Sequence, residues 1–121
     1  MKVYLSHASR FDYAKDLYAP IKKSVLFLSH IFILPHDAAV TSQNSKEIIA
    51  QSDVIIAETS YPSTGQGIEL GWANAFSKPI FCICKKGICG SSSLISVCTS
   101  SAEYETEKEL MHEIVTFLDS L

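Results

Sequence analysis

The part of the sequence that decides the fold is residues 52–73, which have the sequence SDVIIAETSYPSTGQGIELGWA. The apolar run Val54–Ala57 is typical of a buried strand, and Tyr61–Gly65 supplies turn-forming residues. Residues Gly65–Phe76 then have the length and composition of a helix. A strand, a polar loop and a helix in this order make up most of a βαβ unit, so the segment predicts a parallel sheet covered by helices.

The same alternation continues on both sides of this segment. Apolar runs predict further strands at residues 2–6, 31–34, 79–84 and 97–98. Helices are predicted at residues 12–24, from Asn44 or Ser45 to the third strand, at 91–96 and near the C-terminal end, where Leu110, Met111, Ile114, Val115 and Leu118 recur at helical spacing. Pro20 lies deep inside its segment and predicts a kink or two shorter helices.

These elements predict an α/β protein with a flavodoxin-like (Rossmann-like) fold. We expect a three-layer sandwich around a five-stranded parallel sheet in the order 2-1-3-4-5. The 121 residues are enough for one compact domain and too few for two, so residues 1–121 are expected to form a single domain.

The composition argues against several classes of protein. Ten basic and 13 acidic residues give a net charge of −3, so we expect no basic face for a nucleic-acid polymer. The apolar run Ile80–Cys84 is far shorter than the roughly 20 residues that cross a bilayer, and no apolar stretch typical of a signal peptide follows Met1. We therefore expect a cytoplasmic protein that binds neither a membrane nor a nucleic-acid polymer.

The four cysteines do not have the spacing of a zinc site. Cys82 and Cys84 alternate in an apolar strand, and Cys89 and Cys98 follow singly, so no C-x2-C pair is present. The sequence thus predicts buried, reduced thiols and no metal.

Glu69 is the residue that the sequence favours for chemistry. Ligands of parallel α/β sheets bind beyond the carboxyl ends of the strands, where loops are expected at residues 6–11, 35–43, 58–67 and 85–93. Glu69 lies in the first turns of the helix after the third of these loops. A helix N-terminus favours an anion and would keep Glu69 ionised, as a nucleophile or a cation stabiliser requires. The simpler alternative is that Glu69 only complements the helix dipole.

The segment 52–73 resembles the signature of the nucleoside 2-deoxyribosyltransferase family, and within it the 2′-deoxynucleoside 5′-phosphate N-hydrolase branch. The matching text is SDVIIAE, followed by PSTGQGIELG. The resemblance implies that Glu69 attacks or stabilises C1′ while the N-glycosidic bond breaks, and that Tyr4 orients its carboxylate. It also implies a homodimer that acts on a small nucleotide or nucleoside without a cofactor.

The resemblance also places the residues that would bind the substrate. Serine at position 63, where transferases typically carry aspartate, favours a 5′-monophosphate over a free nucleoside. Ser45 stands where the family usually has an aspartate that contacts the sugar, His7 occupies a glycine position, and Ala8 replaces a phosphate-binding serine, a role that Ser9 would take over. The residues implied in substrate binding are Arg10, Ser9, Ser63, Gly65, Gly67, Ser93, His36 and Ser45.

Three other functions remain open at this point. One is the transfer of deoxyribose to a second base, although the transferases' C-terminal asparagine has no evident counterpart after Glu103. Another follows from the opening residues 3–9, VYLSHAS, which resemble those of TIR domains that cleave NAD or act in signalling. The third is a nucleotide-binding module without turnover.

Overall fold

The computed structural model describes residues 1–36, 45–89 and 92–121. Within these residues the sheet has five strands in the order β2-β1-β3-β4-β5, and every neighbouring pair is parallel. The strands are β1 (Lys2–His7), β2 (Ile31–Ile33), β3 (Val54–Glu58), β4 (Ile80–Lys85) and β5 (Ser100–Tyr104). The predicted strand order is confirmed.

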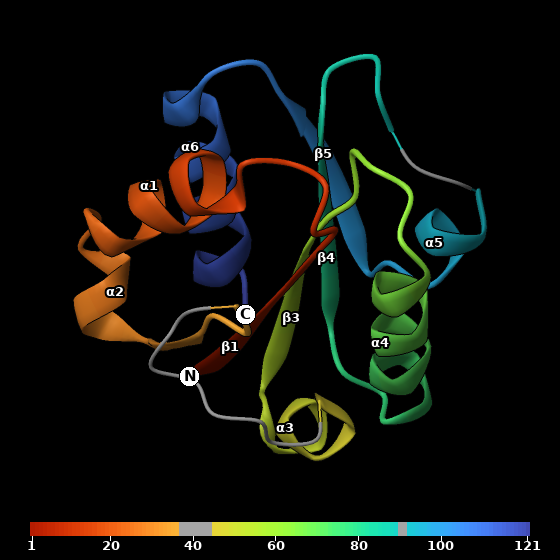
Figure 1. The fold of residues 1–121 in the computed structure, drawn as a ribbon. Helices are drawn as coiled ribbons and strands as arrows, with labels where there is room; N and C mark the ends of the chain where they lie inside the picture. The colour runs from red at the N-terminus through yellow and green to blue at the C-terminus, as the bar shows by residue number, and fades with distance from the viewer. Residues whose placement is uncertain (37–44, 90–91) are drawn as a thin grey trace.

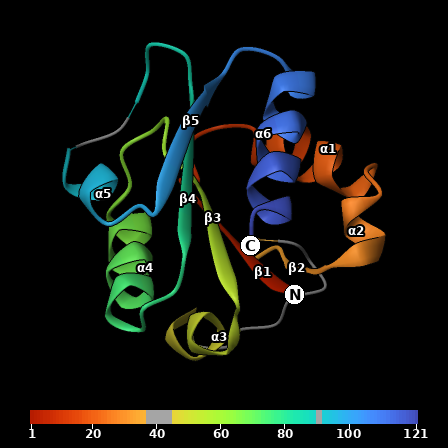
Figure 2. The same ribbon diagram turned by 180° about the vertical axis from the view of Figure 1, so that it is seen from behind.

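Helices cover both faces of the sheet, as Figures 1 and 2 show from opposite sides. One face carries a π-helical turn, η1 (Ala14–Tyr18), with α1 (Ala19–Lys22), α2 (Leu26–Ser29) and α6 (Glu107–Asp119). The other face carries α3 (Ser45–Gln51), α4 (Thr64–Ala75) and α5 (Ser92–Ser96). The predicted three-layer sandwich is therefore confirmed.

Side chains of β1 alternate between two cores, which decides where the site can form. Val3 and Leu5 are fully buried in the core beneath α1 and α6, whereas Tyr4 packs in the core beneath α3 and α4. Because successive strand residues point to opposite faces, Ser6 shares the face of Tyr4. Two polar side chains thus leave β1 towards α4.

Pro20 divides its segment, as predicted. The segment forms η1 and the four-residue α1, with Pro20 in the first turn of α1, before a separate α2 begins at Leu26. A proline has no N–H to donate and its ring crowds the preceding turn, and the wider π-helical turn directly before it accommodates both.

The fifth strand does not lie where the sequence predicted it. Residues 97–98 follow α5, and β5 runs from Ser100 to Tyr104, with Phe81 opposite Ser100 and Lys85 opposite Tyr104. The prediction was wrong because it followed apolar residues, whereas an edge strand can be polar: β5 begins with two exposed serines.

The prediction of reduced thiols was also wrong. The structure joins Cys82 to Cys98 and Cys84 to Cys89, with Cα–Cα distances of 6.0 and 5.4 Å. Both bonds tie β4 to the chain that follows it, a proximity that the spacing in the sequence did not reveal.

Some predictions fall outside the described residues. These include Asn44 as the first residue of a helix, most of the loop expected at 35–43, and part of the loop at 85–93. No helix in the described part of the chain is long and apolar enough to cross a membrane.

Candidate active site

The site forms around the N-terminal half of α4, and Ser63 sets where this helix starts. The Ser63 side chain caps α4, its Oγ accepting a hydrogen bond from the Gln66 N–H at 3.2 Å. The first N–H groups of α4 therefore point towards the carboxyl edge of the sheet, where they favour an anion.

Glu69 reaches from α4 to the two polar side chains of β1. The Tyr4 hydroxyl donates to Glu69 Oε2, and Ser6 Oγ donates to Oε1 at 2.9 Å. Each carboxylate oxygen thus has its own donor, and the donors come from one strand. This arrangement fixes the orientation of the carboxylate in the way that the resemblance implied for Tyr4.

Burial raises the pKa of the Glu69 carboxyl above its ordinary value, although hydrogen bonds from Tyr4 and Ser6 and the charge of His36 lower it. The net direction is opposite to the one expected from the helix N-terminus, because the effect of burial is the largest of these contributions. The pKa of Tyr4 is raised strongly, first by burial and then by Glu69, so Tyr4 stays a proton donor.

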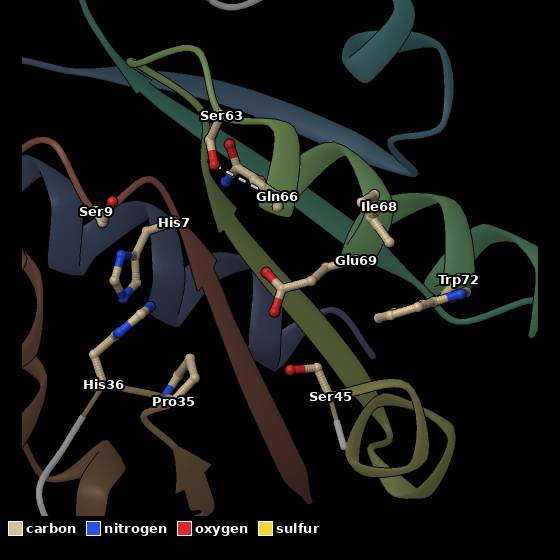
Figure 3. A pocket seen from close by; sticks show the side chains of 11 residues that line it. His7, Ser9, Pro35, His36, Ser45, Ser63, Gln66, Ile68, Glu69 and Trp72 are labelled. Carbon is tan, nitrogen blue, oxygen red and sulfur yellow. Dashed lines mark hydrogen bonds between the residues drawn. The ribbon is translucent and has the colours of Figure 1, made fainter. Parts of the chain in front are cut away.

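A cavity of about 550 Å³ opens in front of Glu69. Figure 3 shows the Glu69 carboxylate extending from α4 into the space bounded by His7, His36 and Ser45. The lining residues come from the end of β1 and the chain after it, the chain after β2, the start of α3, and α4 with the residue before it. They are His7, Ser9, Pro35, His36, Ser45, Ser63, Gly65, Gln66, Ile68, Glu69 and Trp72. A carboxylate, two imidazoles, hydroxyls and an indole suit a small polar ligand with an aromatic part.

His7 holds one wall of this cavity in place. Its Nδ1 pairs with the Ala8 carbonyl oxygen at 2.8 Å, so Nδ1 carries the proton and Nε2 accepts from the Tyr18 hydroxyl at 2.7 Å. The same Tyr18 oxygen accepts from the His36 N–H at 3.1 Å. Burial lowers the pKa of His7, which favours this neutral form. His7 thereby links the end of β1 to His36.

A second, smaller cavity of about 330 Å³ shares Ser9 and Ser63 with the first. Arg10, Pro62 and Thr64 complete its lining, so Arg10 lies beside the capped end of α4. A positive side chain, hydroxyls and free helix N–H groups together are suited to a phosphate.

The structure brings most of the predicted site residues together. Ser9, His36, Ser45, Ser63, Gly65 and Glu69 line the larger cavity, Arg10 lines the smaller one, and Tyr4 contacts Glu69. Ser45 also forms a hydrogen bond that lowers the pKa of Tyr4. Two predicted residues lie elsewhere among the described residues: Gly67 is on α4 with open space around it, and Ser93 is on α5, and neither lines the two cavities.

Sequence reasoning missed Ser6, Gln66 and Glu58. Glu58, fully buried at the end of β3, accepts hydrogen bonds from the Ser60 N–H at 2.6 Å, the Ser60 hydroxyl at 2.9 Å and the Tyr104 hydroxyl. It thereby fixes the loop that leads to Ser63. An acidic residue ending an otherwise apolar strand was the available signal.

Within the described residues, no group of three or more His, Cys, Asp or Glu side chains could hold a metal ion. The fold and site together define a flavodoxin-like α/β protein with a half-buried, hydrogen-bonded carboxylate at the carboxyl edge of its sheet. No protein-family model matches the chain.

Among curated proteins, human 5-hydroxymethyl-dUMP N-hydrolase is 51% identical to this chain over 37 residues. The match is local, covering 31% of this chain and 21% of the human protein. The rat N-hydrolase gives a similar match, 51% over 35 residues and 22% of its length.

Solved structures share the fold over nearly the whole chain. A CMP N-glycosidase from Clostridium botulinum has a TM-score of 0.68 and 22% identity, covering 97% of this chain and 99% of that one. A 2-deoxyribosyltransferase from Bacillus psychrosaccharolyticus has a TM-score of 0.61 and 20% identity, covering 91% and 90%. A flavodoxin-like domain from Synechococcus has a TM-score of 0.53 and 16% identity, covering 86% and 83%. These neighbours confirm the fold, and the local N-hydrolase match confirms the resemblance that the sequence indicated.

Proposed function

We propose that this protein is an enzyme that hydrolyses the N-glycosidic bond of a nucleoside 5′-monophosphate. The observation that carries the proposal is the Glu69 carboxylate, held by Tyr4 and Ser6 in a cavity that shares Ser9 and Ser63 with the anion-suited cavity at Arg10. The names of the CMP N-glycosidase and the 5-hydroxymethyl-dUMP N-hydrolase support the same class of reaction.

Glu69 is suited to the charge that this reaction develops. The C1′–N bond breaks with its electron pair leaving on the base, and positive charge gathers at C1′. A carboxylate ~4 Å from that charge, at an effective dielectric constant near 20, contributes roughly 4 kcal/mol, about a thousandfold in rate. Glu69 either attacks C1′ or stabilises the cation; water then supplies the oxygen that ends on C1′, and its proton balances the released base.

Tyr4 and Ser6 act on this step through Glu69. Their hydrogen bonds hold both carboxylate oxygens and favour the ionised form that the reaction needs. They are therefore positioning residues, and Glu69 is the catalytic residue.

The smaller cavity would bind the 5′-phosphate. Arg10 supplies a positive charge, Ser9 and Ser63 supply hydroxyls, and the start of α4 supplies free N–H groups. Replacing Ser63 by aspartate puts a negative charge at this place, so we expect Ser63→Asp to weaken monophosphate binding at least tenfold while leaving a free nucleoside unaffected. Equal binding of the monophosphate by Ser63→Asp would contradict the phosphate assignment.

The test of the function is a panel of substrates followed for base release. It contains ribo- and deoxyribonucleoside 5′-monophosphates, the free nucleosides and NAD, with Glu69→Gln as the inactive control. Release from monophosphates that disappears in Glu69→Gln supports the hydrolase. Transfer to an added second base would indicate a deoxyribosyltransferase, and nicotinamide release would indicate a TIR-like activity. Binding without release from any compound would indicate a nucleotide-binding module.

The homodimer and the cytoplasmic location are further parts of the proposal. Ser93 lies on α5 and lines neither of these two cavities, so we propose that it contacts the substrate of a second copy in the dimer. Light scattering on the purified protein tests the dimer. The cytoplasmic location is proposed from the nucleotide substrate, and fractionation of the source cells tests it.

A further inference from the structure

Gln66 has a hydrogen-bonding capacity that the proposed mechanism does not use. Its side chain is 1% exposed, and its Nε2 donates to two backbone carbonyl oxygens, that of Ser6 at 3.1 Å and that of Glu58 at 2.8 Å. Both partners are acceptors, which fixes the amide's orientation. Among the buried side-chain oxygen and nitrogen atoms of the described residues, one has no hydrogen-bond partner, and it is Gln66 Oε1.

A buried acceptor without a donor is unfavourable, so native proteins usually provide one. Gln66 lines the cavity in front of Glu69, and Figure 3 shows its amide extending from α4 towards Ser63. Two donors near it are already used, because the Gln66 N–H is bound to Ser63 Oγ and Ser6 Oγ is bound to Glu69. The Ser63 hydroxyl is a further donor beside the amide, and in the proposed function it binds the 5′-phosphate. With the phosphate bound, the donor to Oε1 would then come from the rest of the ligand in the cavity.

The position of Gln66 along α4 indicates which part of a nucleotide would supply it. Ser63, Gln66, Glu69 and Trp72 all line the cavity and are spaced three residues apart, so each is the neighbour of the next on the helix surface. At 1.5 Å per residue this row is about 13 Å long. It presents a phosphate-suited hydroxyl, an amide acceptor, the reacting carboxylate and an aromatic ring, in that order.

If the phosphate lies at Ser63 and C1′ at Glu69, the sugar spans the distance between them and passes Gln66. A phosphate dianion has no donor to offer, and the base lies beyond C1′. The donors that remain are the sugar hydroxyls. On the basis of the proposed function, we propose that Gln66 Oε1 accepts a hydrogen bond from a ribose hydroxyl of the bound nucleotide and is a specificity-determining residue for the sugar.

The test measures binding in the Glu69→Gln background, so that the ligand is not consumed. The probes are CMP, 2′-deoxy-CMP and 3′-deoxy-CMP, chosen because a CMP N-glycosidase shares the fold. Isothermal titration calorimetry gives the Kd of each probe with Gln66 present and with Gln66→Met. With Gln66, we expect removal of one hydroxyl to weaken binding roughly tenfold, and with Gln66→Met this dependence falls below about twofold.

The control variant is Ile68→Met, which alters the same cavity without touching a hydrogen bond. It should leave the dependence on the hydroxyl unchanged. Where Gln66→Met does not fold, Gln66→Lys replaces it, since an ammonium can still donate to the Ser6 and Glu58 carbonyls but offers no acceptor.

Two results would overturn the inference. Equal weakening of all three probes by the Gln66 variant would show a purely structural role, with water as the partner of Oε1. No detectable binding of any probe would also contradict it. Base release by the native chain is measured separately. If the native chain hydrolyses the nucleotide but Gln66→Met does not change the dependence of Kd on the sugar hydroxyl, only the role of Gln66 is refuted. If that dependence is seen but no base is released, only the proposed catalysis is refuted.

Discussion

Glu69 combines burial with hydrogen bonds in a way that suits a reacting group. Burial raises its pKa, which works against the charged form, while Tyr4 and Ser6 act in the opposite direction. A carboxylate held with little water around it interacts more strongly with a developing positive charge than one in solvent. Burial therefore makes the ionised form of Glu69 less stable, but it strengthens the interaction of the carboxylate with the positive charge of the proposed transition state.

Tyr4→Phe should move the pH dependence of activity towards higher pH. The Tyr4 hydrogen bond lowers the pKa of Glu69, so removing it raises that pKa. At a given acidic pH, a smaller fraction of Glu69 is then ionised and the rate of base release is lower. We expect the acid limb of kcat/KM, which reports the free enzyme, to shift upwards, with a plateau roughly tenfold lower. The measurement is base release across the acid range.

The matched control for this experiment is Tyr61→Phe. The Tyr61 hydroxyl bonds to Lys85 Nζ at 3.1 Å, and Tyr61 does not line the cavity of Glu69. Its acid limb should coincide with that of the native protein. An unchanged or downward-shifted limb in Tyr4→Phe would show that Tyr4 does not set the ionisation of Glu69.

At the scale of elements, the loop between β3 and α4 depends on the buried Glu58. Ser60 donates to it twice and is itself bound by the Lys85 N–H at 2.8 Å, while Tyr104 donates from β5. One carboxylate thus ties β3, β4 and β5 together immediately before Ser63. This network therefore fixes the position of Ser63, which lines the cavity proposed to bind phosphate.

Glu58→Ala should destabilise the protein and disturb that end of the site. It leaves buried donors of Ser60 and Tyr104 without an acceptor, which costs about 3 kcal/mol of the free energy of unfolding. Urea denaturation measures this, and KM for a monophosphate should rise as Ser63 loses its fixed position. Glu105→Ala is the control: its ion pair with Lys86 is exposed, so its loss should change the free energy of unfolding little. Equal stabilities of the two variants would contradict the role of Glu58.

Comparing the observed helices and strands with the sequence shows which sequence patterns were sufficient to predict them. The segment from Val54 through α4 carried an apolar run, turn residues and a helix in succession, and the structure places them as predicted. β5 was misplaced because an edge strand beginning with polar residues has no apolar signature. The resemblance implied the contact between Tyr4 and Glu69. The contacts of Ser6 and Gln66 depend on the directions of their side chains, which spacing alone does not give.

At the scale of the whole molecule, the parallel sheet can be predicted from simple rules of chain connection. The pairing of the cysteines cannot, because it depends on the three-dimensional path of the chain. Strands separated by helices imply right-handed crossovers and hence a parallel sheet, which is what the chain forms. The bonds from Cys82 to Cys98 and from Cys84 to Cys89 depend instead on how the chain after β4 returns along the sheet. Disulfides are uncommon in a reducing cytoplasm, so these bonds also bear on the proposed location.

The Cys82–Cys98 bond should contribute most to the region around α5. This helix has five residues and none of them is buried, so its own packing holds it weakly. The bond closes a loop with a sequence separation of 16, against 5 for Cys84–Cys89. From chain entropy we expect Cys98→Ser to lower the free energy of unfolding by about 3 kcal/mol and Cys89→Ser by about 2 kcal/mol.

Urea denaturation with and without reductant measures these losses, and hydrogen exchange should show faster opening of α5 in Cys98→Ser. Base release should stay within about twofold of the native rate, because neither bond touches a residue that lines the Glu69 cavity. Rapid alkylation of freshly lysed cells followed by mass spectrometry then reports the state in the cell. Stability that is insensitive to both substitutions and to reductant would mean that the folded chain holds four thiols, and would agree with a reducing compartment.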